Sequence, residues 1–188
     1  MPSPAGPADA VLAFTAHHVL AADVEPAWVT ATLPSGDLGA AMNAEFLTGL
    51  PGRLGTQPGT LDIVVAALAA PDDSLADLEA TDEDFEHPRL ARAVAYRRDV
   101  RAFRDGHGGV ITVGYGLAGR VEVSIEIDES ARGAGLGTTL ARQALALGDP
   151  GVPVFAQVAP GNVASLCCFL AAGYRPIGAE VLFHRPSR

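Results

Sequence analysis

Residues 121–147, with the sequence VEVSIEIDESARGAGLGTTLARQALAL, decide the fold of this chain. The first seven residues place an apolar side chain at every second position, which is the period of a β-strand with one buried face. A short polar turn follows, and after it comes the glycine-rich sequence RGAGLG. Residues 138–147 contain no glycine or proline, and Leu140, Ala144 and Leu147 recur at helical spacing. The segment therefore predicts a strand, a glycine loop and a helix in succession.

The glycine loop has the features of an anion-binding site. Glycines let successive backbone N–H groups turn toward one ligand, and the N-terminus of the following helix adds a partial positive charge. Two common phosphate motifs do not fit this sequence. The P-loop needs a lysine after its glycines, and the chain contains no lysine. The Rossmann pattern needs a third glycine where Thr138 stands and an acidic residue about 20 residues later, whereas Asp149 comes too early.

The pattern Arg132-x-x-Gly135-x-Gly137 directly after a strand resembles the pyrophosphate loop of the GCN5-related N-acetyltransferase superfamily. The pattern of that loop is Gln/Arg-x-x-Gly-x-Gly/Ala. The resemblance implies that acetyl-CoA is a cosubstrate whose pyrophosphate rests on the loop amides. For the loop alone, a glycine-rich turn that serves only packing remains the alternative. The cofactor-binding residues that the resemblance implies here are Arg132, Gly133, Ala134, Gly135, Leu136, Gly137 and Thr138.

A second motif further along the chain resembles the other signature of the superfamily. The segment 160–174, PGNVASLCCFLAAGY, holds Asn162, Ser165 and Phe169 in the register of that signature, followed by Gly173 and Tyr174. The resemblance implies that the first three of these contact the cofactor. Two signatures in the correct order are much more specific than either alone.

Phe169 departs from the pattern of the superfamily. Many members have a tyrosine at this place, where it protonates the leaving sulfur, and phenylalanine has no proton to give. Cys168, Tyr115, Tyr174 or water are the substitutes that the sequence offers. Because Phe169 can still pack on a cofactor, the sequence predicts cofactor binding, while the proton source for the leaving sulfur stays open.

Acetyl transfer to an amine needs a base for the amine proton and hydrogen bonds for the developing oxyanion. Glu122 and Glu126 lie on one face of the predicted strand, and a glutamate on this strand is a recurrent base in the superfamily. A solvent-facing or salt-bridged carboxylate is the alternative for either residue. Backbone N–H groups around Ile125 and Ile127 would serve the oxyanion.

The composition is that of a globular chain of 188 residues, with 48% hydrophobic and 19% charged residues. The net charge of −9 argues against a nucleic-acid partner and leans mildly toward a cationic or neutral acceptor. The longest apolar run, residues 63–70, is too short to span a bilayer, and the N-terminus does not resemble a signal peptide. A cytoplasmic protein without a membrane partner is expected.

Metal binding is not predicted. The adjacent His17 and His18 point to different faces, and no third ligand lies at a suitable spacing. Vicinal cysteines rarely bridge, so Cys167 and Cys168 are predicted to be reduced residues near a core.

The remaining segments are assigned from turn signals and periodicity. Residues 11–22 are open between helix and strand. The acidic run 75–86 is either a solvated face or the rim of an acceptor pocket. The other predictions are a short strand at 28–33, helical character at 38–47, a loop at 51–59 and a buried strand at 61–68.

The second half of the chain is predicted to hold the core of the fold. Alternation from 90 to 103 indicates a partly exposed strand, a hairpin turn follows at 105–109, and 110–117 is the returning strand. These two strands and the strand at 121–127 would be three consecutive antiparallel strands. Residues 154–158 should lie parallel to 121–127, and in the superfamily these two strands splay apart around the pantetheine arm. Residues 175–184 would form the closing strand pair.

The chain is therefore expected to have the mixed α/β (α+β) fold of this superfamily: antiparallel strands, one splayed parallel pair and flanking helices. Residues 86–188 would be the core with the acyl-CoA motif, and residues 1–85 the poorly matched part, where the superfamily usually carries acceptor-binding elements. The predicted function is acetyl transfer to a small-molecule or peptide amine by direct attack. An acyl-CoA-binding sensor without turnover and a scaffold with a vestigial loop remain alternatives. Monomer and homodimer are both open, although dimers are common among proteins of this kind.

Overall fold

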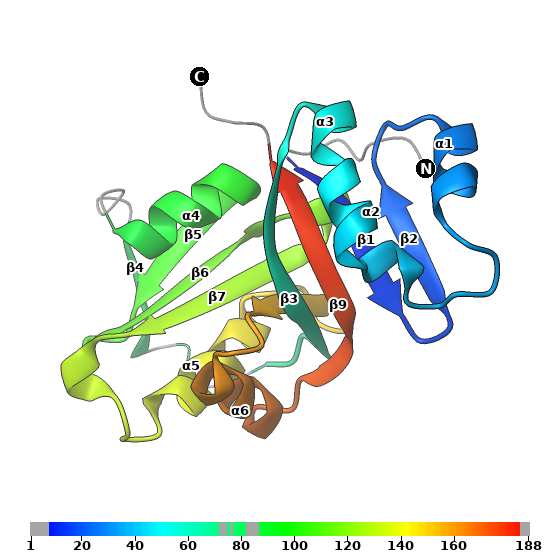
Figure 1. Cartoon of the computed structure of the whole chain (residues 1–188). Helices are drawn as coiled ribbons and strands as arrows, with labels where there is room; N and C mark the ends of the chain where they lie inside the picture. Colours follow the sequence, from blue (N-terminus) through cyan, green and yellow to red (C-terminus); the bar gives the residue numbers. More distant parts are fainter. Residues whose placement is uncertain (1–7, 72–74, 76, 82–86, 185–188) are drawn as a thin grey trace.

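The computed structural model describes residues 8–71, 75, 77–81 and 87–184. In this part of the chain, nine strands form a single mixed sheet in the order β2-β1-β9-β3-β8-β7-β6-β5-β4 (Figure 1). The β7–β8 pair is parallel and the other neighbours are antiparallel. The strands are β1 (Ala8–Phe14), β2 (His17–Ala21), β3 (Gln57–Leu68), β4 (Glu79–Thr81), β5 (Arg98–Arg104), β6 (Gly109–Tyr115), β7 (Val121–Ile127), β8 (Pro153–Val158) and β9 (Arg175–His184).

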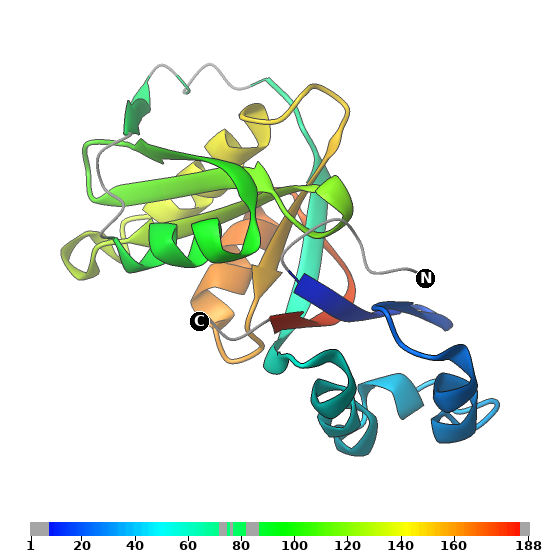
Figure 2. The same cartoon turned by 90° about the horizontal axis from the view of Figure 1, so that it is seen from above.

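The alternation of β7 separates the two faces of the sheet, as predicted. Val123 and Ile125 join the main apolar core with Leu140 of α5 (Leu136–Ala146). The polar residues between them face the other side, where α4 (Pro88–Tyr96) covers β5, β6 and β7 (Figure 2). Helix α6 (Val163–Ala171) packs beside α5. The sheet therefore has an apolar face under α5 and α6, and a polar face under α4.

The first part of the chain builds the far end of the sheet. Residues 11–22, for which the sequence left helix and strand open, belong to a hairpin of β1 and β2. Beside it lie α1 (Pro26–Thr32), α2 (Ala44–Gly49) and α3 (Pro51–Leu54) (Figure 1). Phe46, Leu50 and Phe183 are buried in a second apolar cluster, and Trp28 stacks on Phe46 with ring centroids 5.4 Å apart.

Three predictions in this region are wrong or incomplete. Residues 28–33 are mostly helical, because Pro26 starts α1 and tertiary packing outweighs the strand preference of WVTATL. The helical segment 38–47 is a short 3-10 turn, η1 (Ala40–Met42), followed by α2, whose N-cap Asn43 accepts a hydrogen bond from the Phe46 amide at 2.8 Å. The predicted loop 51–59 contains α3 and the first residues of β3.

The prediction of a strand across residues 90–103 is also wrong in its first half. Pro88 occupies the first turn of α4, and the ring nitrogen Nδ1 of His87 accepts a hydrogen bond from the Arg89 amide at 3.2 Å. The helix buries Leu90 and Ala93 and leaves its arginines toward solvent or the cavity described below. Only the second half of the predicted strand is a strand, and this is β5. The predicted hairpin then leads into β6, and β7 follows, so the three consecutive antiparallel strands are confirmed.

Residues 175–184 form one strand, β9, and not a strand pair. The neighbour that separates β9 from β8 is β3, which comes from the first part of the chain and pairs antiparallel with both. The predicted strand at 61–68 is confirmed as part of β3, in the middle of the sheet, but within it only Val64 and Val65 are buried. Residues 1–85 and 86–188 contribute strands to one sheet, so the first part of the chain is needed to complete the fold.

Candidate functional site

The parallel ladder between β7 and β8 is short. Its only paired residues are Val121 with Val154 and Glu122 with Phe155, although both strands continue beyond them. This confirms the predicted splayed pair. A cavity of about 1010 Å³ opens where the strands part, and its wall includes Ser124, Ile125, Glu126, Ile127 and Gln157. Beyond the last pair, backbone groups on the facing edges of the two strands have no ladder partner. The carbonyls of Val123 and Ile127 accept from the side chains of Arg97 and Arg132, and the remaining groups are available to a ligand.

The glycine loop forms the wall of this cavity at the head of α5. After η4 (Glu129–Ala131), Gly133 and Gly135 have φ values of 85° and 83°, a region that favours glycine, and Gly135 is the N-cap of α5. The amides of residues 133–137 donate no hydrogen bond to any residue that the structure describes. Arg132, Gly133, Gly135, Leu136 and Gly137 line the cavity, whereas Ala134 and Thr138 do not.

Gly137 is required for packing as well as for the loop. A Cβ atom added there would lie 2.6 Å from Sγ of Cys168 and 3.0 Å from Cδ1 of Ile127. Helix α5 therefore approaches α6 and β7 closely at its N-terminal end, beside the cavity. Cys167 and Cys168 are free thiols, but Cys167 is exposed, so its predicted place near a core is wrong, whereas the half-buried Cys168 lines the cavity.

The residues of the second motif lie on the same cavity. Asn162 is the N-cap of α6, where its Oδ1 accepts a hydrogen bond from the Ser165 amide at 3.1 Å. Both residues line the cavity together with Phe169, whose ring packs against Tyr174 with centroids 4.9 Å apart. The structure thus brings both sequence motifs to one cavity.

Two of the side chains that the sequence offered as proton sources in place of a tyrosine at residue 169 lie outside the cavity. Tyr174 is buried in the main core, and burial raises the pKa of its phenol. Tyr115 is exposed and does not line this cavity. Of the side chains that the sequence offered as proton sources, only Cys168 reaches the cavity wall.

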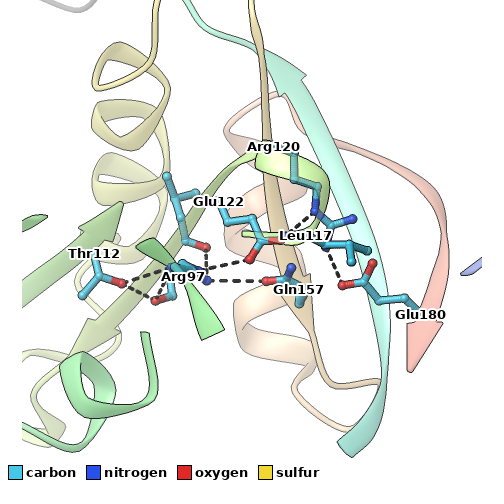
Figure 3. A network of polar contacts seen from close by, with 9 residues as sticks. Arg97, Thr112, Leu117, Arg120, Glu122, Gln157 and Glu180 are labelled. Atoms are coloured by element: carbon cyan, nitrogen blue, oxygen red, sulfur yellow. Dashed lines mark hydrogen bonds and ion pairs between the residues drawn. The ribbon is translucent and has the colours of Figure 1, made fainter. Parts of the chain in front are cut away.

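Glu122 occupies a buried ion-pair network, which is the salt-bridged alternative considered for it. Its side chain is 2% exposed; Oε2 accepts from Arg97 Nε at 3.1 Å, and Oε1 accepts from Arg120 Nε at 2.7 Å (Figure 3). The amide of Leu117 also donates to Oε1, and Arg120 continues the network to Glu180 at 2.6 Å. Burial alone would raise the pKa of Glu122, but Arg120 and Arg97 outweigh it and hold this pKa below its usual value. This geometry keeps the carboxylate ionised and fully bonded.

Glu126 lies further along β7, in a more open part of the cavity. Its side chain is about one-third exposed, and Oε2 accepts a hydrogen bond from Arg89 Nε at 2.9 Å. No hydrogen bond to Oε1 forms within the described residues. Of the two predicted bases, Glu126 is the one that retains a carboxylate oxygen for a ligand or a water molecule.

The structure adds cavity residues that sequence reasoning missed. Tyr96 and Arg97 belong to the segment that was assigned to a strand, and Pro88 was the signal for a helix there. Gln157 lies in the predicted strand 154–158, and its polar side chain on an otherwise apolar strand was the only indication. Asp62, on β3, lines the cavity and is the cross-strand partner of Glu180 on β9. Burial raises the pKa of Asp62, which Arg92 partly offsets.

The described residues of the acidic run 75–86 do not line the cavity. Asp77 and Glu79 are not among the residues that line the cavity, and β4 is at the far edge of the sheet. Residues 82–86 lie outside the described residues. Among the described residues no group of three or more His, Cys, Asp or Glu side chains could hold a metal ion, and no described helix has the length and apolar character needed to cross a membrane.

Comparison with solved structures gives similar chains at low sequence identity. A GCN5-related N-acetyltransferase from Kribbella flavida is 19% identical, with a TM-score of 0.44 over 76% of this chain and 64% of that chain. A putative acetyltransferase of the GNAT family from Novosphingobium aromaticivorans is 19% identical, with a TM-score of 0.45 over 71% of this chain and 69% of that chain. A GCN5-related N-acetyltransferase from Sphaerobacter thermophilus is 16% identical, with a TM-score of 0.44 over 77% of this chain and 58% of that chain.

This chain thus spans 64% of the length of the Kribbella flavida protein. No family model and no curated protein matches the sequence.

Proposed function

We propose that this protein is an acetyl-CoA-dependent N-acetyltransferase of the GCN5-related type, which acetylates the amine of a small molecule or a peptide. The observation that carries the proposal is the early end of the β7–β8 ladder, which opens a cavity at the head of α5 beside a glycine loop with free amides. A ligand that bears a diphosphate and an extended amide-containing arm matches both parts of this cavity.

The residues present fit such a ligand. The amides of residues 133–137 and the guanidinium of Arg132 suit a diphosphate, because both are donors at a helix N-terminus. The unpaired edges of β7 and β8 suit the amides of a pantetheine arm, which would hydrogen-bond like an added strand. Asn162, Ser165 and Phe169 would contact the arm from the α6 side.

In the proposed reaction, the amine nitrogen attacks the thioester carbonyl carbon and the carbon–sulfur bond breaks. Glu126 accepts the amine proton, directly or through a water molecule, and backbone N–H groups of β7 near Ile125 and Ile127 stabilise the oxyanion. The sulfur leaves as a thiolate that solvent protonates, since Phe169 has no proton to give. Glu122 orders the site, because both of its oxygens are already bonded to arginines.

Calorimetry with acetyl-CoA tests the binding step. We expect wild-type protein to bind acetyl-CoA and Gly135→Trp to abolish binding, since the indole would fill the loop. Gly151→Trp is the matched control: Gly151 has a similar φ of 79°, has open space around it and lies outside the cavity. Absence of binding by the wild type, or equal loss in both variants, contradicts the proposal.

Release of free thiol across a panel of amines tests turnover. We expect Glu126→Gln to lower kcat by about 10²-fold, the lower end of the usual contribution of a general base. The exposed Glu45, on α2, supplies the control variant Glu45→Gln, which should keep the wild-type rate.

A second candidate is an acyl-CoA-binding sensor without turnover, and Phe169 on the cavity wall favours it. This alternative predicts acetyl-CoA binding that is abolished by Gly135→Trp, together with no thiol release for any amine. The two measurements together therefore separate an enzyme, a sensor and a scaffold.

A further inference from the structure

Arg97 lies where the structure changes from α4 to β5, with its side chain in the wall of the cavity. That side chain is 8% exposed. Helix α4 ends at Tyr96, and the backbone amide of Arg97 donates to the carbonyl of Ala93 as the C-cap of the helix. The guanidinium therefore enters the site from a fixed point on the helix that covers β5, β6 and β7.

Every N–H group of the guanidinium has an acceptor. An arginine side chain has five N–H donors in a planar fork. Here Nε donates to Glu122 at 3.1 Å, Nη1 to Thr112 at 3.3 Å and Ser124 at 3.4 Å, and Nη2 to the Val123 carbonyl at 3.4 Å and Gln157 Oε1 at 3.5 Å (Figure 3). Most of these hydrogen bonds are long. The position of the guanidinium therefore depends on the number of hydrogen bonds and on its full positive charge.

The acceptors come from three neighbouring strands. Thr112 is on β6, Ser124 is on β7 and Gln157 is on β8. Val123 and Ser124 are the first two residues of β7 after its last pair with β8, and Gln157 is two residues beyond the last paired residue of β8. The guanidinium thus connects the two strands at the level where their backbone ladder has ended.

We propose that Arg97 is a positioning residue that fixes the separation of the splayed strands, so that the cavity accepts the pantetheine arm of a CoA thioester. This inference rests on the proposed function, because it assigns a role within the same site. Lysine cannot replace the fork, since an ammonium is a compact charge with three donors and no planar geometry. The diphosphate site at the glycine loop receives no contact from Arg97, so its affinity is independent of this residue.

Arg120 provides a matched control within the same network. It is buried to a similar degree and bonds Glu122 and Glu180, with its guanidinium over the ring of Phe155 at 5.3 Å. Glu122 and Phe155 are the last paired residues of β7 and β8, so these two contacts of Arg120 lie at the closed end of the pair. Loss of Arg120 should cost stability but change the separation of the open strands less than loss of Arg97 does, because Arg97 keeps its acceptors on β6, β7 and β8.

The test is calorimetry on the full chain with two probes, at a temperature where thermal melts show every variant folded. Acetyl-CoA carries both the diphosphate and the pantetheine arm, and adenosine diphosphate carries the diphosphate alone. We expect Arg97→Met to weaken acetyl-CoA binding about tenfold, which corresponds to about 1.4 kcal/mol, and to leave adenosine diphosphate binding unchanged. Arg97→Lys should recover only part of the loss, and Arg120→Met, which leaves the fork of Arg97 in place, should weaken acetyl-CoA binding less than Arg97→Met does.

Four outcomes overturn the inference. If Arg97→Met binds acetyl-CoA as tightly as the wild type does, Arg97 does not set the separation of the splayed strands. If Arg97→Met binds acetyl-CoA and adenosine diphosphate more weakly by the same factor, Arg97 has a general structural role. The same conclusion follows if Arg97→Met and Arg120→Met weaken acetyl-CoA binding equally. If the wild type binds neither probe, the proposed function fails and this inference fails with it, whereas the other three results leave the proposed function standing.

Discussion

The carboxylate of Glu122 lies against the backbone of Gly116, in space that a Cβ atom at residue 116 would occupy. Gly116 directly follows β6, and its amide donates to the Arg120 carbonyl at 3.0 Å in the turn that leads to β7. The absence of a side chain at residue 116 allows Glu122 to lie between Arg97 and Arg120. A glycine outside both sequence motifs is therefore required by the ion-pair network of Glu122.

Gly116→Ala should lower the free energy of unfolding by about 2 kcal/mol, in the range of overpacking in a close-packed interior. The added methyl group would displace Glu122 from its arginine partners, and urea unfolding at neutral pH measures the effect. Gly52→Ala is the control, because a Cβ at Gly52 in α3 meets no atom within 4 Å. Equal effects of the two substitutions would show that the Glu122 pocket tolerates the methyl group.

Glu122→Gln should destabilise the protein in a pH-dependent way. The pKa of Glu122 is lowered in the folded state from its ordinary value of 4.5, so its ion pairs contribute stability above that pH and lose it as the pH falls through the lowered pKa. We expect a penalty of about 3 kcal/mol near pH 7, which is typical of breaking a buried ion pair, and a smaller penalty below pH 4.5. Urea unfolding at several pH values measures it, and a penalty independent of pH would refute the assignment.

Asp62→Asn should change the stability in the opposite direction and raise the free energy of unfolding at neutral pH. The pKa of Asp62 is raised above 3.8 in the folded state, mainly by burial, so ionisation of this carboxyl costs stability as the pH rises through the raised pKa. The variant should be more stable than the wild type near pH 7 by about 0.5 kcal/mol, a small value because solvent screens a half-buried group. The difference in Tm should vanish as the pH approaches 3.8. A variant that is less stable at neutral pH would show that Arg92 outweighs burial.

Tyr174→Phe should be neutral or stabilising by about 1 kcal/mol. The phenol oxygen is buried and has no hydrogen-bond partner among the described residues, so its removal relieves a desolvation cost. The ring contact with Phe169 is retained. Thermal unfolding measures the stability, and thiol release should be unchanged because Tyr174 does not reach the cavity. A loss of stability or of turnover would show that the hydroxyl group has a partner or a catalytic role.

Short-range patterns predicted the centre of the fold well. The strand, loop and helix of residues 121–147 are β7, the glycine loop and α5, and the splayed partner of β7 is β8. Residues 90–97 were assigned to a strand because Ala93 and Ala95 alternate there with the larger residues Val94 and Tyr96. An alternation of small and larger side chains does not distinguish a strand from a helix, and Pro88 was the better signal.

The sequence by itself determined the elements whose order along the chain carries the information: a strand followed by a glycine loop and a helix, and a second motif that holds Asn162, Ser165 and Phe169. Only the tertiary structure decided that β3 lies between β8 and β9, and that Glu122 pairs with Arg97 and Arg120 while Glu126 stays accessible. The physical reason is that periodicity and turn chemistry are local, whereas the burial and ion pairing of a carboxylate depend on residues that are distant in sequence and adjacent only in the folded sheet.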